Sequence, residues 1–245
     1  MITAPQADQR RLLEVQSIDT SMAKLNHRRR TLPQHAVLEE LEARAADTQR
    51  AQVAGRSALA DAQREQNKAE ADVEQVRQRA ARHQARLESG GVSAKDAQAL
   101  EAELAQLAER QSHLEDVELE AMEAVEEAEN HLAQLADMAA AIHADVQRHA
   151  AERDSETASI DKEIEQLAEQ RQALTQGMPE DLLSLYDRVR DRTGGLGAVA
   201  LYGQRTEGAQ LNFSLTELDA IRSAPADEVV TSEEYHYIIV RMDDS

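Results

Sequence analysis

Apolar residues recur every three or four positions in two long stretches of the chain, one on each side of the segment 89–93. This spacing is typical of α-helices that bury one face. When the chain is folded at Gly90-Gly91, positions equally distant from these glycines face each other, so that Val76 meets Leu107 and Leu59 meets Val125. Because the two stripes stay in register over many turns, the pattern predicts an antiparallel helical hairpin.

The first predicted helix begins just after Pro5 and runs to about residue 88. The segment 31–33 interrupts it, because Pro33 has no backbone N–H to donate and its ring clashes with the preceding turn. We therefore expect a kink or a short break near 31–33, followed by a second, longer stretch of the same helix.

Glycine and capping residues set the tip of the hairpin and its far end. Gly90 and Gly91 supply the left-handed conformation that ends a helix. Ser93 followed by Asp96 resembles the capping box that opens one. The returning helix then runs to about residue 176 and stops at Gly177.

All the aromatic residues lie beyond the hairpin, at Tyr186, Tyr202, Phe213, Tyr235 and Tyr237. The sequence thus predicts two domains, an antiparallel coiled-coil hairpin at 1–177 with its tip at 89–93, and a small head at 178–245. In the head we expect a helix at 179–192 and a helix at 215–222 opened by a capping box. We also expect two strand hairpins, formed by 198–202 with 210–213 around a turn at 207–208, and by 229–231 with 235–242. The predicted fold class is mainly α, with a small α+β head.

Composition excludes several classes of protein. Aromatic residues make up 2% of the chain and charged residues 30%, which suits long helices better than a large globular core. The formal net charge of −20 repels nucleic acid unless positive charge is locally concentrated. There is no cysteine, no apolar run long enough to span a bilayer and no signal-peptide pattern at the start. We expect a cytoplasmic protein that does not enter a membrane.

The ordered set of segments resembles a bacterial family that joins a long helical hairpin to a C-terminal four-cysteine zinc ribbon. The resemblance covers nearly the whole chain. It rests on QRRLL at 9–13, TLP at 31–33, RLESGGVS at 86–93, LEAEL at 100–104, PEDLL at 179–183, LTEL at 215–218 and IIVR at 238–241.

In such relatives two Cys-x-x-Cys knuckles hold a zinc ion, and the resemblance places these ligand positions at Thr206, Ala209, Ser232 and Tyr235. Neutral hydroxyls and a methyl group do not replace thiolates as zinc ligands. The resemblance therefore implies a zinc-ribbon-like head without metal, held by apolar packing, and we expect no cofactor. A site made instead from nearby oxygen and imidazole groups is disfavoured; its members would be Glu207, Glu233, Glu234 and His236.

Basic residues are the candidate contacts to partners. The cluster near the N-terminus comprises Arg10, Arg11, Lys24, Arg28, Arg29 and Arg30, together with His27. The head adds Arg188, Arg190 and Arg205. One interpretation is contact with phosphate or with an acidic protein. The other is a solvated helix face paired with carboxylates of the returning arm such as Glu152, Asp154 and Glu156.

Other charged or glycine-rich segments have simple structural interpretations. The acidic stretch 116–129 is typical of a solvated helix surface, although it would also attract a basic partner. His143 and His149 are six residues apart and do not share a helix face as metal ligands would. The glycines at 194–197 lack the following Lys-Ser/Thr of a phosphate-binding loop.

No arrangement of nucleophile, base and acid is visible, so we expect no enzyme. The favoured hypothesis is a non-enzymatic adaptor or scaffold that binds unidentified proteins along the hairpin or at the head. The alternative is a nucleic-acid-binding protein that uses the arginines named above, which the net charge disfavours. A third hypothesis is a purely structural oligomer; the hairpin pattern itself favours a monomer or a weak homodimer.

Overall fold

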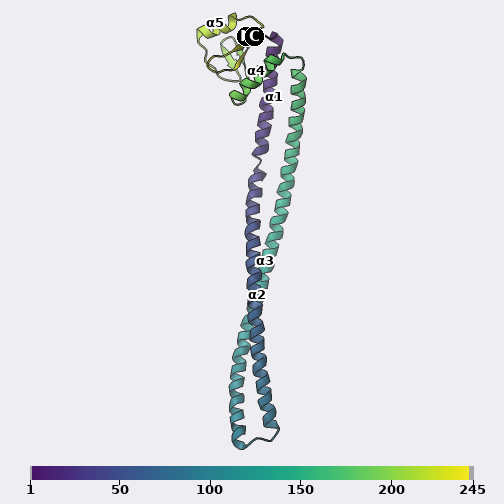
Figure 1. The fold of residues 1–245 in the computed structure, drawn as a ribbon, viewed down its shortest axis with the longest axis vertical. Helices are drawn as coiled ribbons and strands as arrows, with labels where there is room; N and C mark the ends of the chain where they lie inside the picture. Colours follow the sequence, from purple (N-terminus) through teal and green to yellow (C-terminus); the bar gives the residue numbers. More distant parts are fainter. Residues whose placement is uncertain (1, 243–245) are drawn as a thin grey trace. The chain divides into compact units, whose positions relative to one another are not determined.

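The computed structural model describes residues 2–242, which fold into five helices and a four-stranded sheet. The helices are α1 (Gln6–Arg30), α2 (Pro33–Glu88), α3 (Ala94–Thr175), α4 (Glu180–Arg192) and α5 (Leu215–Ser223) (Figure 1). The strands are β1 (Ala198–Tyr202), β2 (Arg205–Glu207), β3 (Val230–Thr231) and β4 (Ile238–Met242). The fold is thus mainly α with a small C-terminal sheet, as the sequence predicted.

The described chain forms two compact units. One combines Met1–His35 with Ala151–Ser245, and the other is Ala36–Ala150. The predicted domain boundary between 1–177 and 178–245 stays a prediction. The two compact units are divided differently, since the first helix and the end of α3 belong to the same unit as the head. No helix within residues 2–242 is long and apolar enough to cross a membrane.

Within Ala36–Ala150, α2 and α3 pair along their apolar stripes. Val73, Val76 and Leu107 are buried, as the predicted seam requires. Polar contacts also join the two helices: the Gln52 amide donates to the Leu135 carbonyl oxygen at 3.2 Å. Arg77 pairs with Glu115 at 2.7 Å, and His83 lies 3.0 Å from Glu103. The antiparallel hairpin is confirmed, whereas the pairing of Val76 with Leu107 and of Leu59 with Val125 stays a prediction.

The tip of the hairpin lies between α2 and α3, as predicted. Gly90 adopts a φ of +68°, the left-handed conformation that ends α2. The Ser93 hydroxyl oxygen accepts the Asp96 N–H at 3.2 Å and donates to the Asp96 carboxylate at 2.7 Å. The capping interaction therefore opens α3, although the carboxylate binds the Ser93 hydroxyl and not its backbone N–H.

The predicted interruption near 31–33 is also present. Helix α1 ends at Arg30, and the Thr31 N–H bonds to the His27 and Arg28 carbonyl oxygens at 3.0 and 3.1 Å. Helix α2 begins at Pro33, where a missing N–H costs nothing because the first turn of a helix leaves its donors unpaired.

The head is a sheet with the strand order β2-β1-β4-β3, covered on both faces. Strand β1 runs parallel to β4 and antiparallel to β2, and β3 runs antiparallel to β4. Side chains alternate between the faces: Ile238 and Val240 join the apolar cluster of α1 and α4, whereas Ile239 joins that of α5. The head thus has two small apolar cores, one on each face.

Three details of the predicted head are wrong. The partner of β1 is β2, Arg205–Glu207, and residues 210–213 form no strand. The turn lies at Gly203-Gln204 and not at 207–208, because Tyr202 pairs with Arg205 and Gly203 supplies a φ of +53°. The last strand begins at Ile238 and not at 235, because 235–237 are part of a turn in which His236 has a φ of +63°.

The parallel pairing of β1 with β4 was not predicted, and neither was the role of the N-terminal segment. Thr3 forms an antiparallel bridge with Glu228. The Ala4 N–H donates to the Asp227 carbonyl oxygen at 2.7 Å, and the Val229 N–H donates to the Ile2 carbonyl oxygen at 3.1 Å. The first residues of the chain are therefore attached to the head.

Candidate partner-binding surfaces

A buried carboxylate, Asp19, joins three helices beneath the head. Its side chain on α1 is 2% exposed. One carboxylate oxygen accepts from the Arg171 Nε on α3 at 2.8 Å. The other accepts from the Tyr186 hydroxyl on α4 at 2.8 Å and lies 3.5 Å from an Arg190 guanidinium nitrogen. Two cations and a hydroxyl donor thus surround one anion, which compensates the cost of burying it.

Burial and the hydrogen bond to Asp19 together raise the pKa of Tyr186 well above its ordinary value. The hydroxyl therefore keeps its proton and acts as a hydrogen-bond donor at neutral pH. Arg171 also pairs with Asp187 at 2.9 Å, so that both α3 and α4 take part in the network. The arrangement fixes helices in place and leaves no free base or nucleophile at this position.

Two buried glutamines of α1 bind the loops of the head. The Gln16 amide donates to the Gly195 carbonyl oxygen at 3.0 Å, and its oxygen accepts the N–H groups of Gly197 and Ala198. The Gln9 amide donates to the carbonyl oxygens of Ala4 at 2.8 Å and Ala226 at 3.2 Å. The glycine-rich loop is therefore a structural turn whose backbone groups are already used.

Several of the predicted contact arginines form ion pairs within the protein. Arg28 pairs with Glu156 at 2.9 Å and Arg29 with Asp161 at 2.6 Å. Arg11 pairs with Asp8 at 3.0 Å and also donates to the Leu174 carbonyl oxygen. These contacts agree with the interpretation of a solvated face paired with the returning arm.

The other predicted contact residues are spread over several elements. In α4, Arg190 reaches Asp19, and the Arg188 Nε donates to the Ser184 carbonyl oxygen at 3.2 Å. Arg10 is partly buried on α1. Exposed side chains to which the described structure assigns no ion pair are those of Lys24 and Arg30 on α1 and Arg205 on β2. Their roles as contacts stay predictions.

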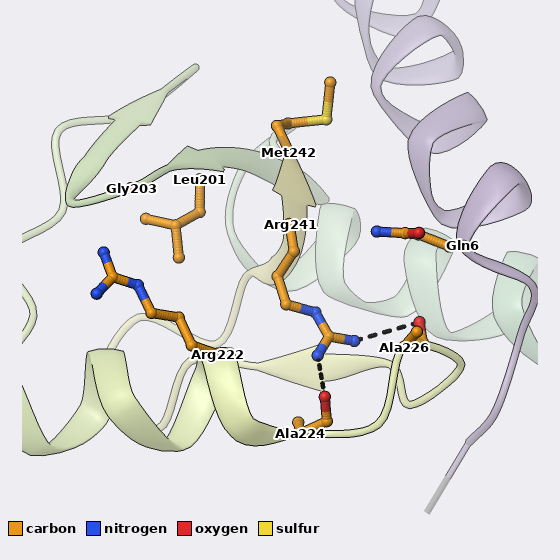
Figure 2. A pocket seen from close by; sticks show the side chains of 8 residues that line it. All are labelled: Gln6, Leu201, Gly203, Arg222, Ala224, Ala226, Arg241 and Met242. Carbon is orange, nitrogen blue, oxygen red and sulfur yellow. Dashed lines mark hydrogen bonds between the residues drawn. The ribbon is translucent and has the colours of Figure 1, made fainter. Parts of the chain in front are cut away.

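Arg241 on β4 lies beside a polar cavity of the head with a volume of about 430 Å³ (Figure 2). Figure 2 shows its guanidinium directed at Ala224 and Ala226, whereas that of Arg222 lies at the Leu201 and Gly203 side of the cavity. The Arg241 guanidinium donates to the carbonyl oxygens of Ile221, Ala224, Pro225, Ala226 and Glu228. It therefore holds the end of α5 and the following loop, a role that no local sequence pattern indicates.

The four positions assigned to zinc ligands take part in two different kinds of contact. The Thr206 hydroxyl donates to the Ala209 carbonyl oxygen at 2.7 Å and accepts the Leu211 N–H at 3.1 Å. The Ser232 hydroxyl oxygen accepts the Tyr235 N–H at 2.9 Å. The side chains of Ala209 and Tyr235 pack against the apolar cluster beneath α5. The hydroxyls thus hold the turns, and the other two side chains add apolar contact.

The acidic metal site that the sequence disfavoured has no counterpart in the described chain, since residues 2–242 contain no group of three or more His, Asp or Glu side chains placed to hold a metal ion. Glu233 and Glu234 lie next to each other in a turn, and His236 follows with its left-handed backbone. The residues in the two turns therefore fit zinc poorly.

The comparison with known proteins decides the family. The model of the CT398-like coiled coil hairpin domain matches residues 15–194. The chain belongs to this family. It is 32% identical over 237 residues to the uncharacterized proteins MT2288 and Rv2229c of Mycobacterium tuberculosis, an alignment that covers 97% of this chain and 96% of theirs.

Solved structures support the same fold. A structure from Mycobacterium smegmatis aligns with a TM-score of 0.82 and 28% identity, covering 98% of this chain and all of that one. CT398 from Chlamydia trachomatis aligns with a TM-score of 0.68 and 16% identity, covering 96% of this chain and 98% of its own. The family therefore establishes the hairpin and gives no indication of an enzyme, while its relatives here carry no assigned activity.

One surface on the family hairpin was missed by sequence reasoning. Leu119 and Met122 on α3 are 57% and 48% exposed and lie three residues apart, which makes them neighbours on the helix surface. Exposed carboxylates lie on the same stretch of α3, namely Asp116, Glu120, Glu123, Glu126 and Glu127. The repeat of buried apolar positions does not indicate this pair, because neither residue belongs to the seam.

Proposed function

We propose that this protein is a non-enzymatic adaptor whose helical hairpin and head bind other proteins. The observation that carries the proposal is the exposed pair Leu119 and Met122 within the acidic surface of α3. Large apolar side chains that gather on an exposed surface are typical of protein-binding sites, whereas single ones are common on any surface. The carboxylates around the pair would favour a partner with basic residues next to an apolar contact.

The polar groups buried beneath the head support a role without catalysis. Asp19, Gln16 and Gln9 each bind groups on other elements and have structural partners for their oxygen atoms or amides. A catalytic site needs a titratable group directed at a substrate. Here the one titratable group among them, the Asp19 carboxylate, is already bound by Arg171 and Tyr186, and the two glutamine amides bind backbone groups, which suits a rigid module that presents a surface.

The turns of the head support a metal-free ribbon. The hydroxyls of Thr206 and Ser232 bond to backbone groups of their own turns, and Tyr235 contacts Phe213 edge-to-face with ring centroids 6.5 Å apart. Such aromatic pairs add roughly 0.5–1.5 kcal/mol beyond the area that they bury. Local hydrogen bonds and aromatic packing thus act where relatives of the zinc-ribbon type would use a metal.

The ion pairs of Arg28 and Arg29 favour protein binding over nucleic-acid binding. Both guanidinium groups already face a carboxylate, so their charges are less available to phosphate. The net charge of −20 acts in the same direction.

Affinity purification with the full chain tests the proposal. We expect proteins to co-purify with the native chain, and at least one of them to be lost when Leu119→Ser and Met122→Ser are combined. The matched control is Val53→Ser, which removes an equally exposed apolar side chain from α2. Absence of any specifically captured protein would contradict the adaptor function, and so would captured nucleic acid whose binding weakens steeply with salt.

Light scattering at several protein concentrations tests the remaining hypothesis of a structural oligomer. The adaptor proposal expects the mass of a monomer or a dimer that dissociates on dilution. A large assembly whose mass is independent of concentration would instead favour a structural role.

A further inference from the structure

One edge of the head sheet has backbone groups that no strand of the sheet uses. In β3, Val230 faces Ile239 and Thr231 faces Ile238 of β4. The Ser232 N–H donates to the Tyr237 carbonyl oxygen of the neighbouring segment. The Ile238 N–H points away from β3 and donates to the Gly197 carbonyl oxygen. In an antiparallel pair, inward and outward backbone groups alternate along the strand. The N–H and C=O groups of Thr231 therefore point outwards, to the open edge of β3.

The same edge already accepts an extended segment. At Val229, which has the same backbone orientation as Thr231, the N–H donates to the Ile2 carbonyl oxygen at 3.1 Å. Thr3 bridges Glu228 in antiparallel register. The edge from Asp227 to Val229 thus pairs with the start of the chain. The continuation of this edge at Thr231 pairs with no other described strand.

A cavity of about 210 Å³ lies beside this continuation, between α5 and β3. Its apolar lining comes from both elements and from the segment before α5: Phe213, Ala220, Ile221, Ala224 and Val230. The Val230 side chain packs on the apolar cluster beneath α5, so the cavity opens on the α5 face of the sheet. A volume of this size accommodates one aliphatic side chain of a strand added to the edge.

The polar lining of the cavity is acidic. Glu217, Glu228 and Glu233 contribute to it, and no lysine or arginine does. The Glu217 carboxylate accepts the Ser214 N–H at 2.9 Å, and the hydrogen bonds from the Ser214 backbone and hydroxyl lower the pKa of Glu217. Glutamates in solvated positions are ionised at neutral pH. The cavity therefore combines an apolar floor with a negative rim.

We propose that the cleft between α5 and the open edge of β3 binds an extended segment of a partner protein, with one aliphatic side chain in the cavity and Lys or Arg residues on either side of it. Main-chain hydrogen bonds to a sheet edge supply affinity in this mode of recognition, and pockets for alternate side chains supply specificity. The inference names a partner class for the adaptor function proposed above and rests on it.

Thr231 would exchange backbone hydrogen bonds with the added segment, as Val229 does with Ile2. Residues two apart in a strand point to the same face, so a basic residue two positions from the aliphatic one lies over the carboxylates. A segment of the pattern Lys-Thr-Ile-Thr-Lys meets these requirements. The acidic rim disfavours a segment of the pattern Glu-Thr-Ile-Thr-Glu through like-charge repulsion.

The test measures binding of three capped, fluorescein-labelled peptides to the full chain by fluorescence anisotropy. The peptides contain Lys-Thr-Ile-Thr-Lys, Lys-Thr-Ser-Thr-Lys or Glu-Thr-Ile-Thr-Glu. We expect the first to bind at least tenfold more tightly than the other two. Equal binding of the first two would contradict the role of the cavity, and a failure of all three would overturn the proposal.

Three variants locate the binding site. Ala220→Phe fills the cavity from the exposed face of α5 and is expected to abolish binding. Glu233→Lys should weaken binding roughly two- to fivefold, while its matched control Glu234→Lys, which alters the adjacent glutamate outside the cavity, should not. Thr231→Pro removes the outward N–H, a change that an edge strand tolerates, and should weaken binding roughly two- to tenfold relative to Thr231→Val.

The outcome separates this inference from the adaptor function. If Glu233→Lys and Glu234→Lys act alike, or if Thr231→Pro binds as Thr231→Val does, the peptide lies elsewhere and the inference is wrong. Capture of whole proteins through Leu119 and Met122 would remain unaffected by that result, because those residues lie on α3 in the other compact unit.

Discussion

Replacement of Asp19 by asparagine is expected to destabilise the attachment of the head to α1. The two side chains have nearly the same volume, so that Asp19→Asn removes the negative charge without leaving a cavity. One carboxylate oxygen becomes an NH₂ group, which either opposes the Arg171 Nε–H or makes the Tyr186 hydroxyl accept a hydrogen bond instead of donating one. The substitution therefore replaces a charged acceptor by a neutral amide and leaves two arginines without their shared counter-ion.

The structure sets the size of the effect. A hydrogen bond to a charged group contributes about 1.5–3 kcal/mol to stability, and the bond from the buried Tyr186 hydroxyl belongs to this class. Breaking a fully buried ion pair costs about 3–5 kcal/mol. The side chains of Arg171 and Arg190 are 27% and 30% exposed, however, so water compensates part of that loss. We expect a decrease in the free energy of unfolding of about 2–3 kcal/mol.

Urea titration followed by tyrosine fluorescence measures this decrease at the head itself. All four tyrosines lie between residues 186 and 237, and the chain has no tryptophan, so this signal does not report on the hairpin arms. The control is Glu14→Gln, which removes one negative charge from an exposed position of the same helix. We expect the control to change stability by less than about 0.5 kcal/mol. An equally small change for Asp19→Asn would refute the view that this network fixes the head.

Three further predictions concern the head. The pKa of Tyr186 is raised in the folded state, so the folded protein binds this proton more tightly than the unfolded chain does. Stability should therefore fall as the pH rises past about 10, the ordinary tyrosine value. In Tyr186→Phe, the urea midpoint should depend less on pH between about pH 8 and 11. Gly197→Ala places a methyl group 2.5 Å from the buried Tyr186 ring and should cost about 1–3 kcal/mol in a urea titration, with a native-like midpoint contradicting the packing. Ser214→Ala removes the cap of α5, whose hydroxyl accepts the Glu217 N–H at 3.2 Å, and should cost about 1 kcal/mol, while Ser214→Asp should retain most of the stability.

The hairpin could be predicted from the sequence because its information is local. The repeat of apolar residues, the break before Pro33 and the glycines at the tip each act within one or two turns of helix. The strand pairing of the head could not be predicted in the same way. Alternation along β1 and β4 says which face each residue covers, but not which strand lies beside it, and the partners are forty residues apart.

The buried polar residues of α1 explain another difference. The apolar repeat of the sequence runs through Leu12, Val15 and Ile18, whereas the structure buries Leu12, Val15 and Asp19 and leaves Ile18 partly exposed. The spacing of Asp19 from Leu12 and Val15 fits a helix face well. Nothing local shows, however, that the donors which make its burial possible come from Arg171 and Tyr186, more than 150 residues later.

The ion pairs of the basic cluster could be predicted only in part from the sequence. The sequence offered Glu156 as a partner for the arginines, and Arg28 does contact it. Arg29 instead reaches Asp161, because consecutive residues on a helix point about 100° apart and meet different turns of α3. The exposed pair Leu119 and Met122 does have a local sequence signal, since both are large apolar residues outside the seam. The repeat of buried apolar positions does not include them.

The attachment of the first residues to the last strands has a consequence for folding during synthesis on the ribosome. Ribosomes add roughly 5–20 residues per second, so Asp19 is made roughly eight to thirty-five seconds before Tyr186 and Arg190 exist to surround it. During this interval the apolar face of α1 has no native partner, and Gln9 and Gln16 have no loops to bind. The nascent chain must therefore keep its first helix soluble until nearly the whole protein has been made. A messenger truncated before α4 would yield a hairpin in which Asp19 keeps Arg171 but lacks Tyr186 and Arg190, and in which Leu12 and Val15 lack their apolar partners from α4 and the sheet.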